Sequence, residues 1–507
     1  MALKIIMLVA FFAVMICVGF YCRKEAQNVD GFVLGGRKVG PWLTAFAYGT
    51  SYFSAVVFVG YAGQFGWKYG IASTWAGIGN AVIGSLLAWI ILGKRTRIMS
   101  RTLNSSTMPD FFGKRFDAKS LKIGASIITF VFLIPYTASL YNGLSRLFGM
   151  AFNIDYTICV IIMAVLTGVY VIAGGYMATA INDFIQGIVM LGGIVAVIIA
   201  VINGKGGFAS AFAQMTQVSD PSVGAEHGAF ASIFGPDPIG LLGVVILTSL
   251  GTWGLPQMVQ KFYAIKDESA IKKGTIISTI FALVVAGGCY FLGGFGRLFA
   301  DQIDVKAGGY DSIIPTMLSG LPDILIGIVV ILVLSASMST LSSLVLTSSS
   351  TITIDLVNEA KKKKMSDKSQ VLLMRVLIVV FIALSVIIAI VQYKSNVTFI
   401  AQLMGISWGA LAGAFLAPFL YSLFWKGTTK AACWGNFVFS VAFMLIDLFG
   451  NLTGAQILPV LLRSPINAGA FCMLAGFAIV PIVSAFTKKP SVGITEFAFS
   501  DIGKKNK

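Results

Sequence analysis

Apolar segments of about 20 residues recur along the chain, and they restrict its fold more than any other feature. One such segment, coiled as an α-helix, spans the roughly 30 Å hydrocarbon core of a membrane. Of the 507 residues, 57% are hydrophobic and 11% are charged, which leaves too little polar surface for a soluble globular protein. The sequence therefore predicts an all-α polytopic membrane protein. Its roughly thirteen transmembrane helices are expected at residues 4–21, 42–65, 72–93, 123–148, 157–174, 183–203, 239–260, 274–296, 322–347, 371–393, 397–424, 431–450 and 466–487.

The positive charges predict how these helices thread the membrane. If the first helix begins outside, 29 of the 37 Lys and Arg residues fall on one side, which the positive-inside rule makes cytoplasmic. We therefore expect a multi-pass protein of the plasma (inner) membrane with its N-terminus outside and its C-terminus in the cytoplasm. The net charge of +16 then sets topology in the lipid bilayer and does not indicate a nucleic-acid partner. No obligate protein partner is evident.

A run of hydroxyl side chains interrupts the apolar pattern. The segment SASMSTLSSLVLTSSS, residues 335–350, carries ten hydroxyls in sixteen positions. In a helix Ser339, Ser342 and Ser343 stand at i, i+3 and i+4, so they share one face. Small hydroxyl residues also let membrane helices pack closely, and packing alone is one interpretation. The other is a Na⁺ site, because hard oxygens replace the water that an alkali cation loses.

Asp183, in the segment ATAINDFIQG, is a rare acidic residue at the start of an expected span. A carboxylate in the first turn of a helix also interacts favourably with the helix dipole, so a structural role is the alternative interpretation. Together with neutral hydroxyls, however, one carboxylate gives a site of nearly zero net charge when a Na⁺ is bound. Asp183 is therefore a candidate cation ligand.

Two expected spans contain residues that break helices near the middle of the membrane. The first reads AFAYGTSYFSAVVFVGYAG and the second ILTSLGTWGLPQMVQKF, with Gly254 and Pro256 at its break. The breaks fall at corresponding places in two halves, which is typical of an inverted-repeat transporter with five helices in each repeat and broken first and sixth core helices. The expected parts of the chain are an extra helix with its lead (1–41), a first repeat (42–203), an external loop (204–238), a second repeat (239–424), two peripheral helices (425–487) and a tail (488–507).

Polar and aromatic residues at the two breaks are candidates for binding a solute. In transporters of this kind, the solute lies near the midplane where the broken helices meet, and the exposed N-termini of the half-helices favour an anionic group on it. An aromatic residue inside a bundle can equally be core. The candidates are Tyr52, Ser54, Thr248, Thr252 and Trp253, with Tyr136 and Tyr141 from the segment YTASLYNG.

Several separate segments resemble the sodium/solute symporter family over nearly the whole chain, and the helix count and N-out topology fit its bacterial branch. They are GFVLGGRKVGPW, AGGYMATAINDFIQ, ASMSTLSS and ISWGALAGAFLAPFLYSLFW. The resemblance implies a five-plus-five inverted-repeat fold, alternating access, and Na⁺ as the coupling ion for uptake of a small organic solute. It also implies a first sodium site made of carbonyls and hydroxyls, at Thr50, Phe53, Ala336, Ser339 and Thr340. A possible second sodium site would use Asp183, Ser342 and Ser343.

The resemblance says less about the identity of the solute than about the identity of the coupling ion. In the proline branch of the family an aspartate is expected where this chain has Tyr52, which argues against simple proline transport. The segment GLPQMVQKFYAIKD resembles members of the pantothenate type, with Gln257 in place of their histidine. An amino acid or a monocarboxylate such as pantothenate is therefore expected.

Other classes of membrane protein fit the sequence less well. An ion channel with a hydroxyl-lined cation pathway is the alternative, but channels usually build their filters symmetrically, and this chain has a single hydroxyl run. An enzyme is not expected, because the spans contain no HExxH, Ser–His pair or carboxylate dyad. The sequence therefore predicts a secondary transporter.

Overall fold

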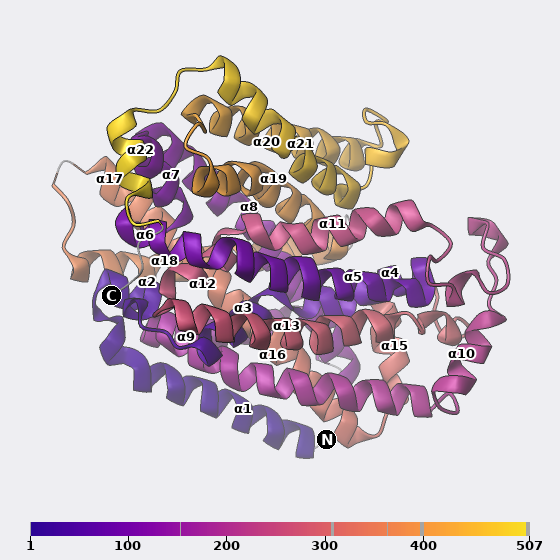
Figure 1. Ribbon diagram of the computed structural model, residues 1–507. Helices are drawn as coiled ribbons and strands as arrows, with labels where there is room; N and C mark the ends of the chain where they lie inside the picture. Colours follow the sequence, from indigo (N-terminus) through magenta and orange to yellow (C-terminus); the bar gives the residue numbers. More distant parts are fainter. Residues whose placement is uncertain (1, 153, 306–308, 362, 396–399, 503–507) are drawn as a thin grey trace.

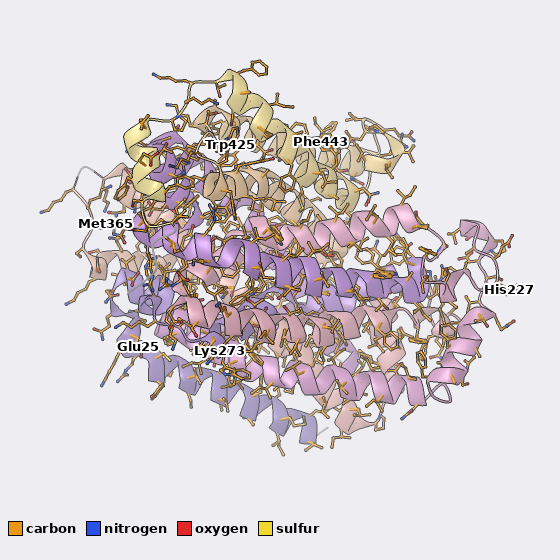
Figure 2. The ribbon with its side chains drawn as sticks, in the orientation of Figure 1. Glu25, His227, Lys273, Met365, Trp425 and Phe443 are labelled. Atoms are coloured by element: carbon orange, nitrogen blue, oxygen red, sulfur yellow. The ribbon has the colours of Figure 1, made fainter. Side chains whose placement is uncertain are left out.

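Helices make up almost all of the described chain in the computed structural model. Figure 1 shows the long helices lying side by side, with α10 (Phe208–Thr216) at one end of the bundle and α22 (Val492–Phe499) at the other. His227 lies at the α10 end, whereas Glu25 and Met365 lie at the opposite end (Figure 2). The expected span 397–424 and the expected tail 488–507 extend beyond the described residues, which are 2–152, 154–305, 309–361, 363–395 and 400–502.

The bundle consists of long helices together with shorter and π-helical pieces. The long helices are α1 (Ala2–Tyr21), α8 (Lys119–Phe152), α9 (Tyr156–Asn203), α11 (Pro238–Gly254), α13 (Glu268–Gly293), α16 (Asp323–Thr351), α18 (Asp367–Ser395), α19 (Ile400–Phe424), α20 (Lys430–Thr453) and α21 (Pro465–Phe486). The shorter ones are α2 (Val29–Leu34), α3 (Pro41–Tyr52), α4 (Ala62–Tyr69), α5 (Thr74–Gly79), α6 (Lys94–Thr102), α7 (Met108–Phe116), α12 (Pro256–Ala264), α15 (Ile313–Ser319) and α17 (Asn358–Ala360). The π-helical stretches are η3 (Val56–Tyr61), η5 (Asn80–Leu87), η6 (Trp89–Gly93) and η11 (Ile352–Val357).

The expected count of about thirteen spans is not confirmed. The described residues contain 10 helices long and apolar enough to cross a membrane, or up to 11 if the bent pair of α11 and α12 is one span. The physical reason is that some neighbouring spans are joined without a loop. Helix α9 has 48 residues, about 72 Å at a rise of 1.5 Å per residue, and covers both 157–174 and 183–203. It bends at Gly175, whose φ of 56° is a conformation that favours glycine.

The first expected break lies where the sequence places it. Helix α3 ends at Tyr52, Phe53 adopts extended backbone angles, and the amides of Val57 and Phe58 then donate to the carbonyl of Ser54 as the helix resumes. Serine is favoured at such a helix start because its hydroxyl can cap the free amides. Here the Ser54 hydroxyl has no hydrogen-bond partner among the described residues, so it remains free for another acceptor or donor.

The second expected break follows directly from a proline. Pro256 has no N–H and disfavours the helical conformation of the preceding residue, and Leu255 is extended with φ −81° and ψ 123°. Helices α11 and α12 meet there at a bend of 47°. Gly254 allows close packing at this point, because a Cβ on it would lie 2.8 Å from the backbone N of Leu416 in α19.

Helix α16, which carries the hydroxyl run, lies in the middle of the bundle. All its residues from 329 to 351 are buried, and it contacts α3, α8, α9 and α18. Large apolar side chains are exposed instead on outer helices such as α1, where Ile6 and Val9 belong to the surface that lipid would cover. The hydroxyls of α16 therefore face protein, and their partners must be found within the bundle.

A loop at the α10 end is fastened to the bundle through Arg297. The guanidinium lies 2.7 Å from the carboxylate of Asp220 and stacks over the rings of Trp67 and Phe230, at 4.3 and 4.4 Å from their centroids. Hydrogen bonds from Ser222, and then from Arg297, lower the pKa of Asp220 below its ordinary value. The loop between α10 and α11 is thus held by a charged contact at its start.

Candidate functional site

Two hydroxyls of α16 face the backbone carbonyls of the first broken helix. Ser339 Oγ lies 3.1 Å from the carbonyl oxygen of Thr50 and 3.1 Å from that of Ala336. Thr340 Oγ1 lies 3.3 Å from the Thr50 oxygen, 3.4 Å from the Ser51 oxygen and 3.1 Å from the Ala336 oxygen. All these residues are fully buried.

The donors in this group are fewer than the acceptors. Ser339 and Thr340 have one hydroxyl hydrogen each, and these two hydrogens face the carbonyls of Thr50, Ser51 and Ala336. Because α3 ends at Tyr52, its last carbonyls also lack the usual helical partners. The group therefore has an excess of oxygen lone pairs pointing at one another, which a cation would stabilise.

The oxygen spacing also suits a cation of the size of Na⁺. Ca²⁺, whose radius is nearly the same, binds oxygens at about 2.3–2.6 Å, so adjacent ligands at right angles lie about 3.3–3.7 Å apart. The separations between the Thr340 hydroxyl and the Thr50 and Ser51 carbonyls, 3.3 and 3.4 Å, fall in this range. Small relative movements of α3 and α16 would suffice to place an ion between them.

The structure brings together four of the five residues expected at the first sodium site. Thr50, Ala336, Ser339 and Thr340 meet as described, and Ser51, which the sequence analysis did not include, contributes its carbonyl. Phe53 lies at the break itself, and its amide donates to Gly49. The carbonyl that the resemblance assigned to Phe53 therefore stays a prediction.

The residues expected at a second sodium site come from two helices, Asp183 from α9 and Ser342 and Ser343 from the neighbouring part of α16. Both carboxylate oxygens of Asp183 are buried without a hydrogen-bond partner among the described residues. The Ser342 hydroxyl donates to the carbonyl of Ser339 at 2.9 Å, and the Ser343 hydroxyl lies 2.7 Å from that of Ser51. Lys261 of α12, which the sequence analysis did not single out, enters the same space and donates to Ser343 at 2.9 Å.

Three of the expected solute residues meet where the two broken helices face each other. The hydroxyl of Tyr52 donates to the carbonyl of Thr248 at 2.8 Å, which joins the end of α3 to α11. The ring of Tyr52 stacks on Trp408 of α19 at 6.1 Å between centroids, and Tyr136 of α8 meets Trp408 edge-on at 5.9 Å. Sequence reasoning missed Trp408, because nothing distinguishes a tryptophan within an apolar segment from an ordinary core residue.

The remaining solute candidates divide into two groups. Thr252 and Trp253 donate to the carbonyls of Gly84 and Ile83 in η5, so their polar atoms already have partners. Ser54 and Tyr141, by contrast, are buried with hydroxyls that lack a hydrogen-bond partner among the described residues. The amide of Gln257, next to the second break, has neither of its atoms bonded within the described chain. Buried polar groups without partners are costly, so a polar ligand that satisfies them would bind favourably.

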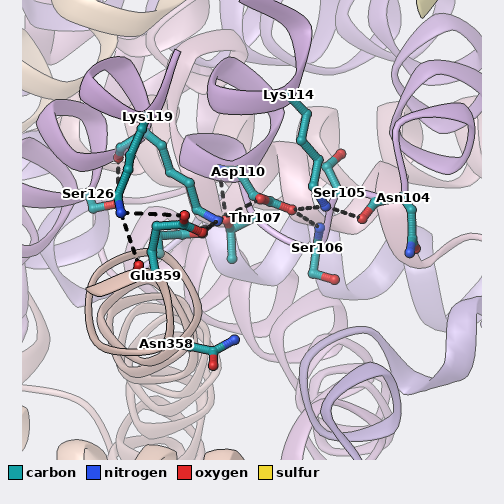
Figure 3. Close-up of polar contacts among 12 residues, drawn as sticks. Asn104, Ser105, Ser106, Thr107, Asp110, Lys114, Lys119, Ser126, Asn358 and Glu359 are labelled. Atoms are coloured by element: carbon teal, nitrogen blue, oxygen red, sulfur yellow. Dashed lines mark hydrogen bonds and ion pairs between the residues drawn. The ribbon is translucent and has the colours of Figure 1, made fainter. Parts of the chain in front are cut away.

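A second polar cluster joins η11 and α17, which follow α16 in the chain, to α7 and α8. Lys122 Nζ lies 2.9 Å from Asp110, 3.5 Å from Asp355 and 3.2 Å from Glu359. Lys119 adds a further contact to Glu359, and Figure 3 shows Asp110, Thr107, Lys119 and Glu359 close together. Because Asp355 is fully buried, its charge depends on Lys122 and on the hydroxyl of Thr107. The cluster therefore holds η11 and α17, which continue α16, against α7 and α8.

Comparisons with known proteins identify the family. The sodium:solute symporter family model matches residues 32–438. The osmoregulated proline transporter OpuE of Bacillus subtilis (strain 168) is 29% identical over 495 residues, which are 96% of this chain and 95% of that protein. The sodium/proline symporter of Staphylococcus aureus (strain JH9) is 28% identical over 513 residues, 98% of this chain and 95% of its own.

Two solved structures share the fold. A Na⁺-coupled sialic acid symporter in an outward-open state superposes with a TM-score of 0.74 at 18% identity, covering 96% of this chain and 98% of that one. Mhp1, a nucleobase-cation-symport-1 family transporter, superposes with a TM-score of 0.50 at 13% identity over 93% and 98%. The expected all-α fold with an inverted-repeat core is confirmed by these neighbours.

The structure is a bundle with helices long and apolar enough to cross a membrane, and it places an oxygen-rich group between α3 and α16. The chain belongs to the sodium:solute symporter family, so it couples Na⁺ to the movement of a solute. The alternative of an ion channel finds no support among the relatives.

Proposed function

We propose that this chain drives the uptake of a small carboxylate-bearing organic solute, an amino acid of about the size of proline, with Na⁺ bound between α3 and α16. The solute crosses the membrane unchanged, and no bond is made or broken. The proposed first-site ligands are Thr50, Ala336, Ser339 and Thr340, with Ser51 added and Phe53 retained as an expected carbonyl ligand.

One short segment carries the proposal, because it serves both the ion and the solute. Between residues 50 and 54 the chain turns from α3 into the break, and the carbonyls of Thr50 and Ser51 face α16. Tyr52, next in the chain, faces Thr248 and Trp408 on the other side. A Na⁺ that fixes these carbonyls therefore also fixes the wall of the solute site, which is the reciprocal coupling that symport requires.

The chemistry of the solute site favours a carboxylate. The amides at the N-terminus of α12 have no side-chain cap, and the Gln257 amide beside them is buried and unbonded within the described chain. Helix N-termini and amide donors bind anionic groups. The relatives named above are proline transporters, so proline is the first solute to test. Because this chain has Tyr52 where the proline branch is expected to have an aspartate, other amino acids and pantothenate are tested beside it.

We further propose that the protein lies in the plasma membrane with its N-terminus outside, as its positive charges predict. The end of the bundle with α22 would then face the cytoplasm, and α10 the exterior. An inward Na⁺ gradient and the membrane potential would supply the driving force, the latter worth about 2.3 kcal/mol per charge per 100 mV. The division into two repeats at 42–203 and 239–424 is retained as a prediction.

Transport by the purified full-length protein in proteoliposomes tests the proposal. We would impose an inward Na⁺ gradient and measure uptake of radiolabelled L-proline, other small amino acids and pantothenate, with a K⁺ gradient of equal size as the control. Saturable uptake of one of them only with Na⁺, together with solute-stimulated entry of ²²Na⁺, is the expected result. Entry of ²²Na⁺ that is unsaturable and indifferent to every solute would overturn it.

A further inference from the structure

A lysine occupies the space beside Asp183 where a second sodium ion was expected. Lys261 projects from α12, and its ammonium lies 2.9 Å from the Ser343 hydroxyl and 4.0 Å from the nearer carboxylate oxygen of Asp183. It also lies 5.1 Å from the centroid of the Tyr176 ring. The ammonium therefore contacts two of the three residues that the second sodium would use.

Lys261 and Asp183 are both sealed from solvent. Their side chains are 3% and 0% exposed. Ionised groups buried to this degree need an opposite charge, and the described structure shows no other charged side chain in contact with either of them. The two charges thus compensate each other and leave this region with no net charge.

An added Na⁺ at Asp183 would upset that balance. It would meet the carboxylate only with the ammonium already present, so two cations would share a single anion in a low-dielectric interior. The Ser342 hydroxyl, moreover, is turned toward the carbonyl of Ser339 at 2.9 Å. The lysine supplies at this position the positive charge that an ion would otherwise bring.

We infer that Lys261 is a built-in cation that excludes a second Na⁺ from Asp183, so that this transporter binds one Na⁺, at the Ser339–Thr340 site, in each cycle. The inference rests on the proposed function for the identity of that first site. Because Lys261 is part of the chain, its charge is not released with the solute. One solute is therefore transported with one Na⁺, whereas a transporter that also bound Na⁺ at Asp183 would move one more positive charge with each solute.

The same contacts connect the lysine to the first site. Ser343 accepts from Lys261 and also lies 2.7 Å from the hydroxyl of Ser51, whose carbonyl faces Thr340. Lys261 therefore stands one side chain away from the ligands of the first ion. It acts as a positioning residue for α12 against α16, and as a selectivity element that sets how many ions bind.

Counting bound ²²Na⁺ on the purified full-length protein tests the inference without knowledge of the solute. The wild type is expected to bind about one Na⁺ with a Hill coefficient near one. Lys261→Met, which keeps the length of the side chain and removes its charge, is expected to bind about two with a coefficient above one. Lys261→Arg is the matched control and should remain at about one.

Two further variants make each outcome decisive. In the double variant Lys261→Met with Asp183→Asn, both charges are removed together, and the count should return to about one. Lys261→Gln repeats the neutralisation with a donor retained toward Ser343, in case the methionine variant does not fold. Two saturable ions on the wild type, or a folded Lys261→Met and Lys261→Gln that both bind only one, would overturn the inference. A failure of every solute to be transported, with these counts as expected, would instead refute the proposed solute class.

Discussion

Replacing Thr340 with valine removes one oxygen from the candidate Na⁺ site and keeps the branched shape of the side chain. The Thr340 hydroxyl stands 3.3 Å from the Thr50 carbonyl and 3.4 Å from that of Ser51. Polar contacts to a charged group contribute about 1.5–3 kcal/mol. At 1.4 kcal/mol per factor of ten, the Na⁺ concentration for half-maximal activation should rise about 10- to 150-fold.

The matched control is Thr340→Ser, which keeps the hydroxyl and removes only a methyl group. Each substitution is expected to lower the free energy of unfolding by about 1 kcal/mol, the serine through lost apolar contact and the valine through the lost hydrogen bond to Ala336. The two variants should therefore differ little in Tm but strongly in Na⁺ activation.

We would measure solute uptake over a range of Na⁺ concentrations, with K⁺ as the balancing ion. This measurement distinguishes a loss of Na⁺ binding from a loss of stability. Valine should shift the curve to higher Na⁺, and serine should leave it within a few-fold of the wild type. If the valine variant is activated at the same Na⁺ concentration as the serine variant, Thr340 is not a ligand and the site between α3 and α16 is wrongly assigned.

Three further changes test other parts of the structure. Tyr52→Phe removes the hydrogen bond that joins the end of α3 to α11, worth about 0.5–1.5 kcal/mol, so the KM for solute at saturating Na⁺ should rise about 2- to 12-fold in uptake assays. Lys122→Met leaves the buried Asp355 carboxylate without its cation and should lower the free energy of unfolding by about 3–5 kcal/mol, seen as a lower Tm that Lys122→Arg does not share. Because the pKa of Asp220 is lowered by folding, its stabilisation is present above the unfolded pKa of about 3.9 and is lost as pH falls through the folded value. Tm measured across that acid range should therefore fall less steeply in Asp220→Asn than in the wild type.

The positions of the helix breaks were predictable because they follow from local chemistry. Pro256 ends a helix wherever it stands, and Leu255 before it is extended for the same steric reason. The hydroxyl face of Ser339, Ser342 and Ser343 was predictable as well, since helical spacing fixes which side chains share a face, whereas Thr340 was named only by the family resemblance. The partner of that face could come only from the family resemblance, because contacts between α3 and α16 join residues nearly 290 positions apart.

The role of Lys261 could not be predicted from the hydropathy pattern. The expected span 239–260 ended one residue before it, so the lysine counted as one of the cytoplasmic charges that set topology. In the structure the chain bends by 47° at Leu255, and α12 turns inward instead of leaving the bundle. The bend buries a residue that a straight helix would have placed in a loop.

The charge balance around α16 explains why such a site can serve a transporter. The proposed first ion site consists of neutral carbonyls and hydroxyls, so it would gain a full positive charge when Na⁺ binds. With Lys261 beside Asp183, the empty core carries no net charge, and the empty protein can reorient without exposing an uncompensated ion to hydrocarbon. A bound Na⁺ alone would break that neutrality. A solute with a net negative charge, such as pantothenate, would restore it, whereas a zwitterionic amino acid such as proline would place its carboxylate near the ion and leave one net positive charge to move with the membrane potential. Reorientation that is disfavoured with the ion alone, and becomes possible once a solute carboxylate lies beside the ion, is the condition for tight coupling.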